Sequence, residues 1–270
     1  MKQRGGEIGE EKKVGLARAL SKMGFCSRSD AAEKIRAGRV RVNGVVRRDI
    51  ETPVRVERDK IEVDGRGVAA KEFVYWMVNK PRGIVTTAED EKGRETVYAL
   101  LPKGVPWMGP VGRLDKASEG LLFLTNDTEW AARITAPEGH VEKKYVVQIG
   151  AVADETLLKK LETGVMDGRE RLRATRATLV RAGEKNSWIE IVLEEGRNRQ
   201  IRRMLERCGV EVLRLIRVAI GGVELGTLAK DAARVMTRAE VKMLKRGKHF
   251  QGLKPLHDTS KKTKGEENNY

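Results

Sequence analysis

The sequence predicts an α+β protein. A small N-terminal helix–helix–hairpin unit is expected to precede a larger unit, built on a mainly antiparallel mixed sheet with flanking helices. Near the N-terminus, apolar residues recur at helical spacing and are followed directly by an Asn-Gly hairpin signal. Beyond residue 73, strand-like runs dominate and the helical segments stand apart from them, which is typical of α+β folds.

The N-terminal unit is expected to span residues 13–64. A first helix over residues 16–23 carries its apolar side chains on one face. Ser27 then caps a second helix, with Asp30 at the reciprocal capping position. This helix ends at Gly38, because glycine favours the backbone conformation that stops a helix.

A hairpin follows the two helices. Residues 40–46 alternate apolar and polar side chains around Asn43-Gly44, a strong signal for a tight hairpin turn. Two more short strands are expected near residues 54–56 and 61–63.

The rest of the chain is expected to consist of a linker, the larger unit and a tail. Residues 65–72 contain glycine and alanine and predict the linker, and residues 73–246 predict the larger unit. Residues 1–12 and 247–270 hold too few apolar side chains to fold, so we expect a flexible leader and a disordered tail. Within the larger unit, strands are expected at residues 73–78, 145–149, 173–180 and 188–193, and helices at 157–161, 200–207 and 239–244.

The charge of the chain indicates a polyanionic partner. The formal net charge is +15 at pH 7. Each phosphate that Lys or Arg neutralises releases condensed counterions, which favours binding to nucleic acid. No apolar run approaches the roughly 20 residues of a membrane span. The charged, glycine-rich start does not fit a signal peptide, so we expect a cytoplasmic protein without a membrane partner.

Cysteine and histidine are too sparse to indicate a metal site. Cys26 and Cys208 cannot form a zinc site of the paired-cysteine type, and a disulfide between them is disfavoured in a reducing compartment. His140, His249 and His257 show no ligand spacing. We therefore expect no metal.

The N-terminal unit is more basic than a solvated surface requires. Residues 13–50 hold ten Lys or Arg side chains and three acidic ones. A charged helix face is commonly only a solvated face. Here the excess has one sign and extends from the helices into the hairpin, which favours contacts with RNA or phosphate.

The stretch from Gly109 to Asp127 is the most informative part of the sequence. It reads as a glycine-bounded loop that carries Arg113 and Asp115, followed by an apolar strand and a polar turn. From the residue types alone, an aspartate in such a loop is usually a turn or cap residue.

This stretch closely resembles the signature of the RsuA/RluB family of pseudouridine synthases, in which Gly-Arg-Leu-Asp is followed by a Gly-Leu-Leu strand and Thr-Asn-Asp. Residues 79–83, 141–145 and 195–204 resemble three further motifs of that family, in the same order. The sequence departs from the family pattern at Ser118, at Thr128 and in the pair Ala136-Pro137, which bears on substrate choice rather than on activity.

The N-terminal unit resembles the S4-type RNA-binding domain of ribosomal proteins and RNA-modifying enzymes. The similarity rests on residues 16–20, 24–28 and 37–44. In that family, two helices and a hairpin present basic residues to structured RNA. Together the two resemblances cover about residues 13–245 and are closest to the RluB branch.

The resemblance implies roles for four residues. Asp115 is the essential carboxylate, which either attacks the sugar carbon as a nucleophile or removes a ribose proton as a base. Arg202 is its expected ion-pair partner, with a phosphate contact as the alternative. Tyr145 would stack on the uracil or assist proton transfer at carbon 5; without the resemblance, a half-buried strand tyrosine would be the better explanation. Arg113 would hold the flipped nucleotide or bind backbone phosphate.

Several arginines are expected to contact RNA. Residues 196–217 alone hold seven arginines against two glutamates, and most of these would bind phosphate or brace the domain. The expected RNA-binding residues are Arg18, Arg28, Arg39, Arg41, Arg113, Arg197, Arg199 and Arg203.

The resemblance implies isomerisation of a uridine in ribosomal RNA, preferably in the large subunit (23S). The alternatives are a uridine in small-subunit (16S) or transfer RNA, or a non-catalytic RNA-binding factor for ribosome assembly. No redox step is involved, so no cofactor is expected. A monomer is expected, because no heptad pattern occurs.

Overall fold

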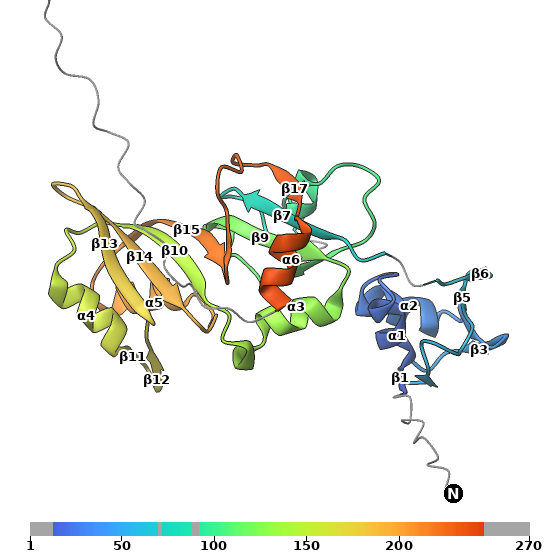
Figure 1. Cartoon of the computed structure of the whole chain (residues 1–270). Coiled ribbons are helices and arrows are strands. Elements are labelled where there is room, and N and C mark those ends of the chain that lie inside the picture. Colours follow the sequence, from blue (N-terminus) through green and yellow to red (C-terminus); the bar gives the residue numbers. More distant parts are fainter. Residues whose placement is uncertain (1–12, 70–71, 88–91, 246–270) are drawn as a thin grey trace, which may run out of the picture.

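A computed structural model describes residues 13–69, 72–87 and 92–245 (Figure 1). The expected leader and tail therefore lie outside the described residues. A small N-terminal unit of helices and short strands lies beside a larger unit with a long sheet, which confirms the α+β class. Within the described residues, no helix has both the length and the apolar character needed to cross a membrane.

The two N-terminal helices form as the sequence predicts. They are α1 (Leu16–Lys22) and α2 (Arg28–Arg36). The capping box of α2 is complete: the Ser27 hydroxyl accepts a hydrogen bond from the Asp30 backbone N–H at 3.0 Å, and the Asp30 carboxylate accepts one from the Ser27 N–H at 3.3 Å.

The short strands of this unit form two small sheets. One has the order β3-β2-β5-β6, and β1 pairs with β4 in the other. Because β6 pairs with β5, the first sheet continues beyond residue 64 into the segment expected as a linker. The strands are β1 (Val14–Gly15), β2 (Val40–Val42), β3 (Val45–Arg47), β4 (Pro53–Val54), β5 (Ile61–Val63) and β6 (Arg66–Gly67).

The larger unit is built on one mixed sheet with the order β13-β14-β10-β15-β9-β7-β17. Its pairs are antiparallel except for β15 with β9, which are parallel. These strands are β7 (Tyr75–Lys80), β9 (Glu119–Thr125), β10 (Lys143–Ile149), β13 (Arg176–Ala182), β14 (Ser187–Leu193), β15 (Val212–Ile220) and β17 (Ala233–Val235).

Shorter elements complete this unit. Strand β8 (Gly109–Val111) pairs with β9, β16 (Val223–Glu224) pairs with β15, and β11 (Val165–Asp167) forms a separate hairpin with β12 (Glu170–Leu172). The helices are α3 (Thr128–Thr135), α4 (Glu155–Thr163), α5 (Gln200–Arg207) and α6 (Arg238–Lys245), with 3-10 turns at Val97–Leu100 and Pro137–Gly139.

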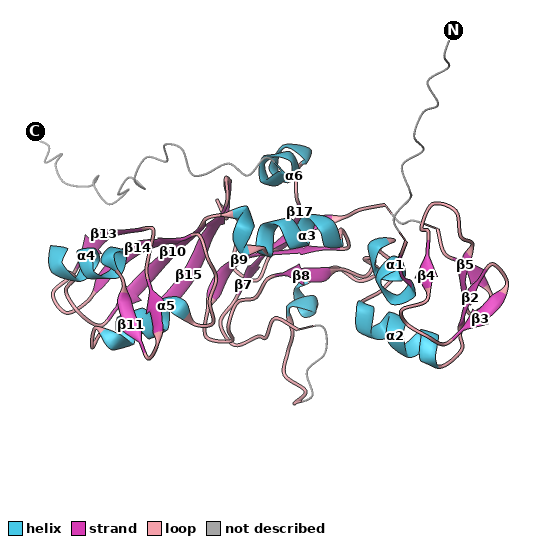
Figure 2. Ribbon diagram, turned by 90° about the horizontal axis from the view of Figure 1, so that it is seen from below, coloured by secondary structure: helices cyan, strands magenta, loops and turns pink. Residues whose placement is uncertain are grey.

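Strand β9 lies in the interior and contributes to two hydrophobic cores. Leu122 and Leu124 belong to one core together with side chains from α4 and α5. Leu121 and Phe123 belong to the other, with side chains from α3 and α6. Since successive strand residues point to opposite faces, helices cover both faces of the sheet here (Figure 2).

Helix α3 and strand β15 were absent from the sequence-based prediction. The polar turn was expected to end the stretch at Asp127, and no element was predicted for residues 128–135. In the structure, Asp127 caps α3 by accepting a hydrogen bond from the Trp130 N–H at 2.9 Å, and Trp130 is fully buried. Strand β15 carries Arg214 and Arg217 among its apolar residues, and these charges concealed a central strand.

The two units touch along α1 and α3. Lys22 forms an ion pair with Glu129 at 2.7 Å. Gly24 adopts a φ of +69° and lies so close to Asn126 that a Cβ there would approach the amide nitrogen to 2.8 Å. Asn126 also accepts a hydrogen bond from the Val74 N–H at 2.9 Å. This side chain therefore anchors the start of β7 beside the N-terminal unit.

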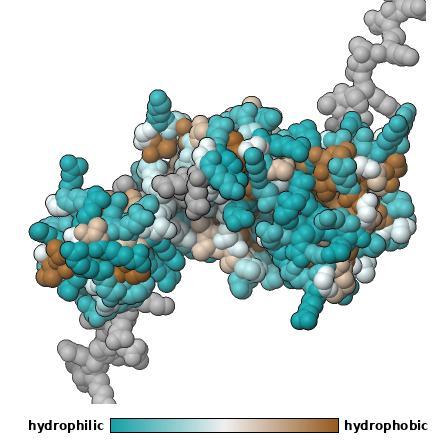
Figure 3. Space-filling model, turned by 180° about the vertical axis from the view of Figure 1, so that it is seen from behind, coloured by the Kyte–Doolittle hydropathy of each residue, from teal (hydrophilic) through white to brown (hydrophobic). Residues whose placement is uncertain are grey.

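The surface behind the sheet is mostly hydrophilic (Figure 3). Hydrophobic side chains gather mainly at the end that carries β13 and β14, on the right of that view. Leu179 and Val180 on the edge strand β13 are each almost half exposed, at 45% and 47%.

Candidate active site

A pocket of about 720 Å³ opens where the loop before β9 meets β10, β15 and the segment before α5. This is a common size for a small-molecule or nucleotide site. Five of the residues predicted from the sequence lie around this one cavity: Arg113, Asp115, Tyr145, Arg197 and Arg199. Arg217 and Lys143 line it as well.

The loop that carries Asp115 is held from beneath by Lys80. Its ammonium donates hydrogen bonds to the carbonyl oxygens of Pro81 (2.9 Å), Asp115 (3.2 Å) and Ser118 (2.8 Å). The Ser118 N–H closes the turn by donating to the Asp115 carbonyl at 2.9 Å. Three bonds from one side chain restrict the backbone from Asp115 to Ser118 and join it to Pro81.

Lys80 lies in an unusual environment for a lysine, since its side chain is fully buried. Burial lowers the pKa of its ammonium to about 8, although the nearby charges of Asp115 and Glu119 act in the opposite direction. The sequence indicated only a lysine-proline turn here. Its position at the end of β7, directly opposite Gly120 on β9, places the ammonium under the loop.

The arginine that reaches Asp115 is not the one that the sequence predicted. Arg199 lies 3.7 Å from the Asp115 carboxylate. Arg202 instead donates a hydrogen bond to the Ala117 carbonyl at 3.1 Å. Arg199 precedes α5 with a left-handed backbone, at φ 49° and ψ 31°, and this turn directs its side chain toward the pocket loop.

Arg202 still contributes to the charge near Asp115. Its side chain is half-buried, and its Nε atom is buried with no hydrogen-bond partner among the residues that the structure describes. Burial lowers the pKa of the Arg202 guanidinium, as does the neighbouring charge of Arg199, while Asp115 raises it. Two cations thus lie next to this carboxylate.

Tyr145 lies in the pocket wall on β10. Its side chain is only 9% exposed. It stands directly opposite Ile191 on β14 and Arg217 on β15. The aromatic ring is therefore fixed by the centre of the sheet.

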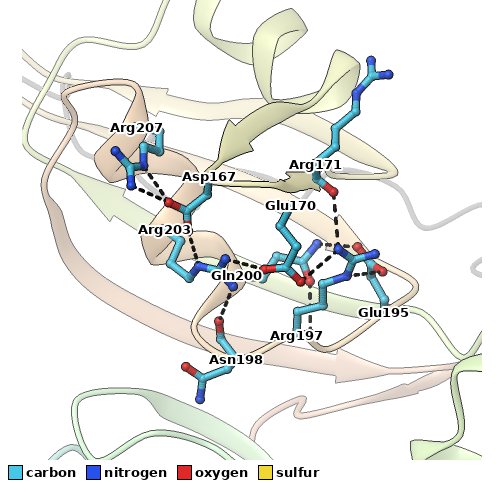
Figure 4. Close-up of polar contacts among 9 residues, drawn as sticks. All are labelled: Asp167, Glu170, Arg171, Glu195, Arg197, Asn198, Gln200, Arg203 and Arg207. Carbon is cyan, nitrogen blue, oxygen red and sulfur yellow. Dashed lines mark hydrogen bonds and ion pairs between the residues drawn. The ribbon is translucent and has the colours of Figure 1, made fainter.

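An ion-pair network connects the β11–β12 hairpin with α5 and the segment before it (Figure 4). Asp167 binds both Arg203 and Arg207, and Glu170 binds both Arg203 and Arg197. These arginines hold the pKa values of the two carboxyl groups below their usual range.

The same network reaches the pocket rim. Arg197 also binds Glu195 at 2.9 Å, and Glu195 accepts a hydrogen bond from the buried Gln200 amide at 3.0 Å. Arg197 and Arg203 were predicted to contact RNA. In the structure their guanidinium groups are already paired with carboxylates, so bracing the fold is their visible role.

The remaining predicted RNA-binding arginines differ in their surroundings. Arg39 binds Asp64 through two hydrogen bonds of 2.7 and 2.6 Å. Arg18, Arg28, Arg41 and Arg113 are exposed, and no ion pair joins them to another described residue. These four side chains are available to a polyanion.

Comparison with known proteins gives the family. The sequence pattern described as RNA pseudouridylate synthase matches residues 74–207, and the S4 domain pattern matches residues 14–61. The chain is 38% identical to the ribosomal large subunit pseudouridine synthase B of Bacillus subtilis (strain 168) over 233 residues, which cover 85% of this chain and 95% of that protein. The chain belongs to the RNA pseudouridine synthase family.

Further relatives of this pseudouridine synthase agree. It is 36% identical to an RNA pseudouridine synthase from Aquifex aeolicus (strain VF5), over 86% of this chain and 93% of that one. A crystal structure of a pseudouridylate synthase superposes with a TM-score of 0.62 at 28% identity, covering 86% of this chain and 99% of the other. The similarity thus spans both units of the synthase.

Three pocket features of the synthase were not recognised from the sequence. The first is the Lys80 clamp, which is the set of three hydrogen bonds from Lys80 to the carbonyl oxygens of Pro81, Asp115 and Ser118; the sequence motif there indicated only a turn. The second is Arg199, which was expected to contact RNA rather than Asp115. Arg217 lies on a strand that was not predicted, although the two apolar residues on each side of it, within residues 215–219, were a usable signal for a buried strand.

Proposed function

We propose that this protein converts a specific uridine of large-subunit ribosomal RNA to pseudouridine, with Asp115 as the essential carboxylate. The main support is the arrangement of Asp115, which the Lys80 clamp holds at the pocket wall beside two arginines. The substrate follows from the relatives in Bacillus subtilis and Xylella fastidiosa, which are named ribosomal large subunit pseudouridine synthase B. This activity would take place in the cytoplasm, where bacterial ribosomes assemble.

The reaction requires an ionised carboxylate at the sugar. The bond between uracil nitrogen 1 and the ribose must break, after which the base turns and rejoins through carbon 5. Asp115 either attacks the sugar carbon or removes a ribose proton, and both roles require its charged form. Arg199 and Arg202 place positive charge beside this carboxylate. No electron leaves the substrate, so the chemistry calls for no cofactor.

Tyr145 and Arg113 are placed to handle the target nucleotide. The Tyr145 ring in the pocket wall offers a surface on which uracil can stack. A uridine in paired RNA must first leave its stack, at a cost of about a few kcal/mol. The exposed Arg113 at the pocket rim can bind the phosphate of the flipped nucleotide.

The N-terminal unit is proposed to hold structured RNA. Its exposed Arg18, Arg28 and Arg41 form no ion pair with another described residue. Only 4% of the chain is aromatic, so charge and shape, rather than stacking on many bases, would dominate recognition.

The proposal can be tested by pseudouridine mapping of ribosomal RNA. Cells that lack the gene are complemented with wild type, Asp115→Asn or the control Asp231→Asn. Asp231 is exposed and has a φ of 65°, which asparagine adopts readily, so its substitution leaves the pocket unchanged. We expect one uridine of the large subunit to lose modification and to regain it with wild type and Asp231→Asn only.

Other outcomes are equally informative. A missing pseudouridine in small-subunit or transfer RNA would change the assigned substrate but not the reaction. Restoration by Asp115→Asn would remove Asp115 from the mechanism. If no RNA changes in the absence of the gene, while the purified protein still binds ribosomal RNA, a non-catalytic role in ribosome assembly would replace this proposal.

A further inference from the structure

Arg217 occupies a central position beside the proposed catalytic groups. It lies on β15 directly opposite Tyr145 on the antiparallel β10. Directly opposed residues of neighbouring strands project from the same face of a sheet, so Arg217 and Tyr145 share a face. On its other side, Arg217 pairs with Gly120 of β9, the strand that follows the Asp115 loop.

The backbone around Arg217 is closely packed. A Cβ at Gly120 would lie 2.2 Å from the Arg217 carbonyl oxygen, so only glycine allows this approach. The guanidinium is held by two backbone acceptors: its Nε donates to the Leu121 carbonyl at 2.7 Å, and Nη1 donates to the Arg113 carbonyl at 3.4 Å. The side chain is therefore fixed before substrate arrives.

One donor of Arg217 finds no acceptor among the described residues. The side chain is 5% exposed, and its Nη2 atom is buried without a hydrogen-bond partner in that part of the chain. Across the described ranges, no carboxylate forms an ion pair with it. A buried donor without an acceptor is unfavourable, by about 1–3 kcal/mol and more for a charged group, and such groups in native proteins call for an explanation.

The surroundings of Arg217 show a positive field within the pocket. Lys143, which also lines the cavity, has its pKa lowered to about 8, chiefly by burial and then by the charge of Arg217. The same arginine acts on buried Lys80 in the same direction. An anion that forms here would relieve this repulsion.

We propose that Arg217 stabilises the uracil anion released when the glycosidic bond breaks, by donating from Nη2 to a carbonyl oxygen of the base. This inference rests on the proposed function. The bond from ribose C1′ to uracil N1 breaks, and its electron pair goes to the base, which spreads the charge over N1, C5 and the two carbonyl oxygens. At the same time, C1′ binds the Asp115 carboxylate, or C2′ gives that carboxylate a proton.

The cycle then closes without any further reactant. The base turns, C5 forms the new bond to C1′, and the Asp115 carboxylate is released or returns its proton to C2′. The C5 proton leaves and N1 gains one, so the product is an isomer of the substrate. The role of Arg217 does not depend on which of the two Asp115 steps occurs, because both expel the same anion.

Burial distinguishes the base from a backbone phosphate as the partner of Arg217. Phosphates remain partly hydrated and are met by exposed arginines such as Arg113 at the rim. Arg217 and Tyr145 are both more than nine-tenths buried, on a shared face of the sheet. The group that reaches them is the flipped base.

A leaving-group experiment tests this role. Single-turnover rates at saturating enzyme are measured on an RNA fragment that carries either uridine or 5-fluorouridine at the mapped position, as loss of the starting nucleoside after digestion and chromatography. 5-Fluorouridine has no C5 proton to lose, so the comparison covers the steps up to the new bond between C5 and C1′. Fluorine withdraws electron density and stabilises the departing anion. For Arg217→Gln we expect a rate loss of about 100- to 1,000-fold on uridine, the usual effect of losing one donor to a developing anion.

On 5-fluorouridine the loss should shrink by at least about tenfold, because this anion depends less on Arg217. The dissociation constant for RNA should stay within about threefold of wild type, since the loss is confined to the transition state. Arg214→Gln is the matched control: it lies on the same strand, pairs with Glu119 at 2.8 Å, and should change both rates by the same factor. Arg217→Lys, which keeps the charge, should lie between wild type and Arg217→Gln on uridine.

Two results would overturn the inference in an active enzyme. Equal losses on both bases would make Arg217 a packing residue. Weaker RNA binding with a smaller salt dependence would make it a phosphate contact. Wild type that converts neither RNA would instead refute the proposed function itself.

Discussion

Substituting Lys80 by methionine tests the clamp beneath Asp115. Methionine keeps an unbranched apolar stem of similar length but cannot donate a hydrogen bond. The carbonyl oxygens of Pro81, Asp115 and Ser118 would then lose their donor inside the protein. The experiment asks how much of the order of this loop depends on one ammonium.

The magnitude follows from two opposing contributions. Hydrogen bonds to a charged group contribute about 1.5–3 kcal/mol each, so the three bonds of Lys80 amount to about 5–9 kcal/mol. Burying the ammonium opposes this: lowering its pKa from 10.5 to about 8 corresponds to about 3 kcal/mol. We therefore expect Lys80→Met to reduce the free energy of unfolding by about 2–6 kcal/mol.

The assay combines denaturant unfolding with single-turnover kinetics. Trp130 is fully buried, so tryptophan fluorescence should respond to unfolding. In the folded fraction we expect turnover to fall by about 100-fold, because a displacement of about 1 Å at the reacting group has that effect. Lys103→Met is the matched control, since Lys103 is exposed and donates to none of the three carbonyl oxygens that Lys80 holds. A loss below about 1 kcal/mol with normal turnover would refute the clamp.

Two further predictions concern charge. Arg41→Gln should reduce the slope of the RNA-binding constant against salt concentration by the equivalent of about one phosphate contact. Arg39→Gln should change this slope less, because Asp64 already pairs with Arg39. Equal slopes for the two variants in a salt titration would contradict this prediction. Arg234 is the chief cause that holds the pKa of Glu240 at about 2, below the 4.5 of a free carboxyl group. The stability that ionised Glu240 contributes is present above about pH 4.5 and is lost as the pH falls through about 2. The difference in unfolding free energy between wild type and Glu240→Gln should therefore shrink over that range. A difference that stays constant from pH 6 to pH 2 would exclude the linkage.

The sequence by itself determined the features that depend on near neighbours. The capping box of α2 and the Asn43-Gly44 hairpin formed as predicted, because their hydrogen bonds join residues only a few positions apart. Helix α5 matched its predicted bounds for the same reason. The Asp115 signature also led to the correct family, since its motifs are continuous in the chain.

Only the tertiary structure decided which charges meet. The parallel pairing of β9 with β15 joins strands about 95 residues apart, and it brings Arg217 to the pocket. Arg203 was expected to contact RNA but forms ion pairs with Asp167 and Glu170. The left-handed turn at Arg199 directs the Arg199 guanidinium to Asp115. The sequence shows which residues are charged. Which opposite charge each of them pairs with depends on the distances between side chains, and these are set only when the sheet has assembled.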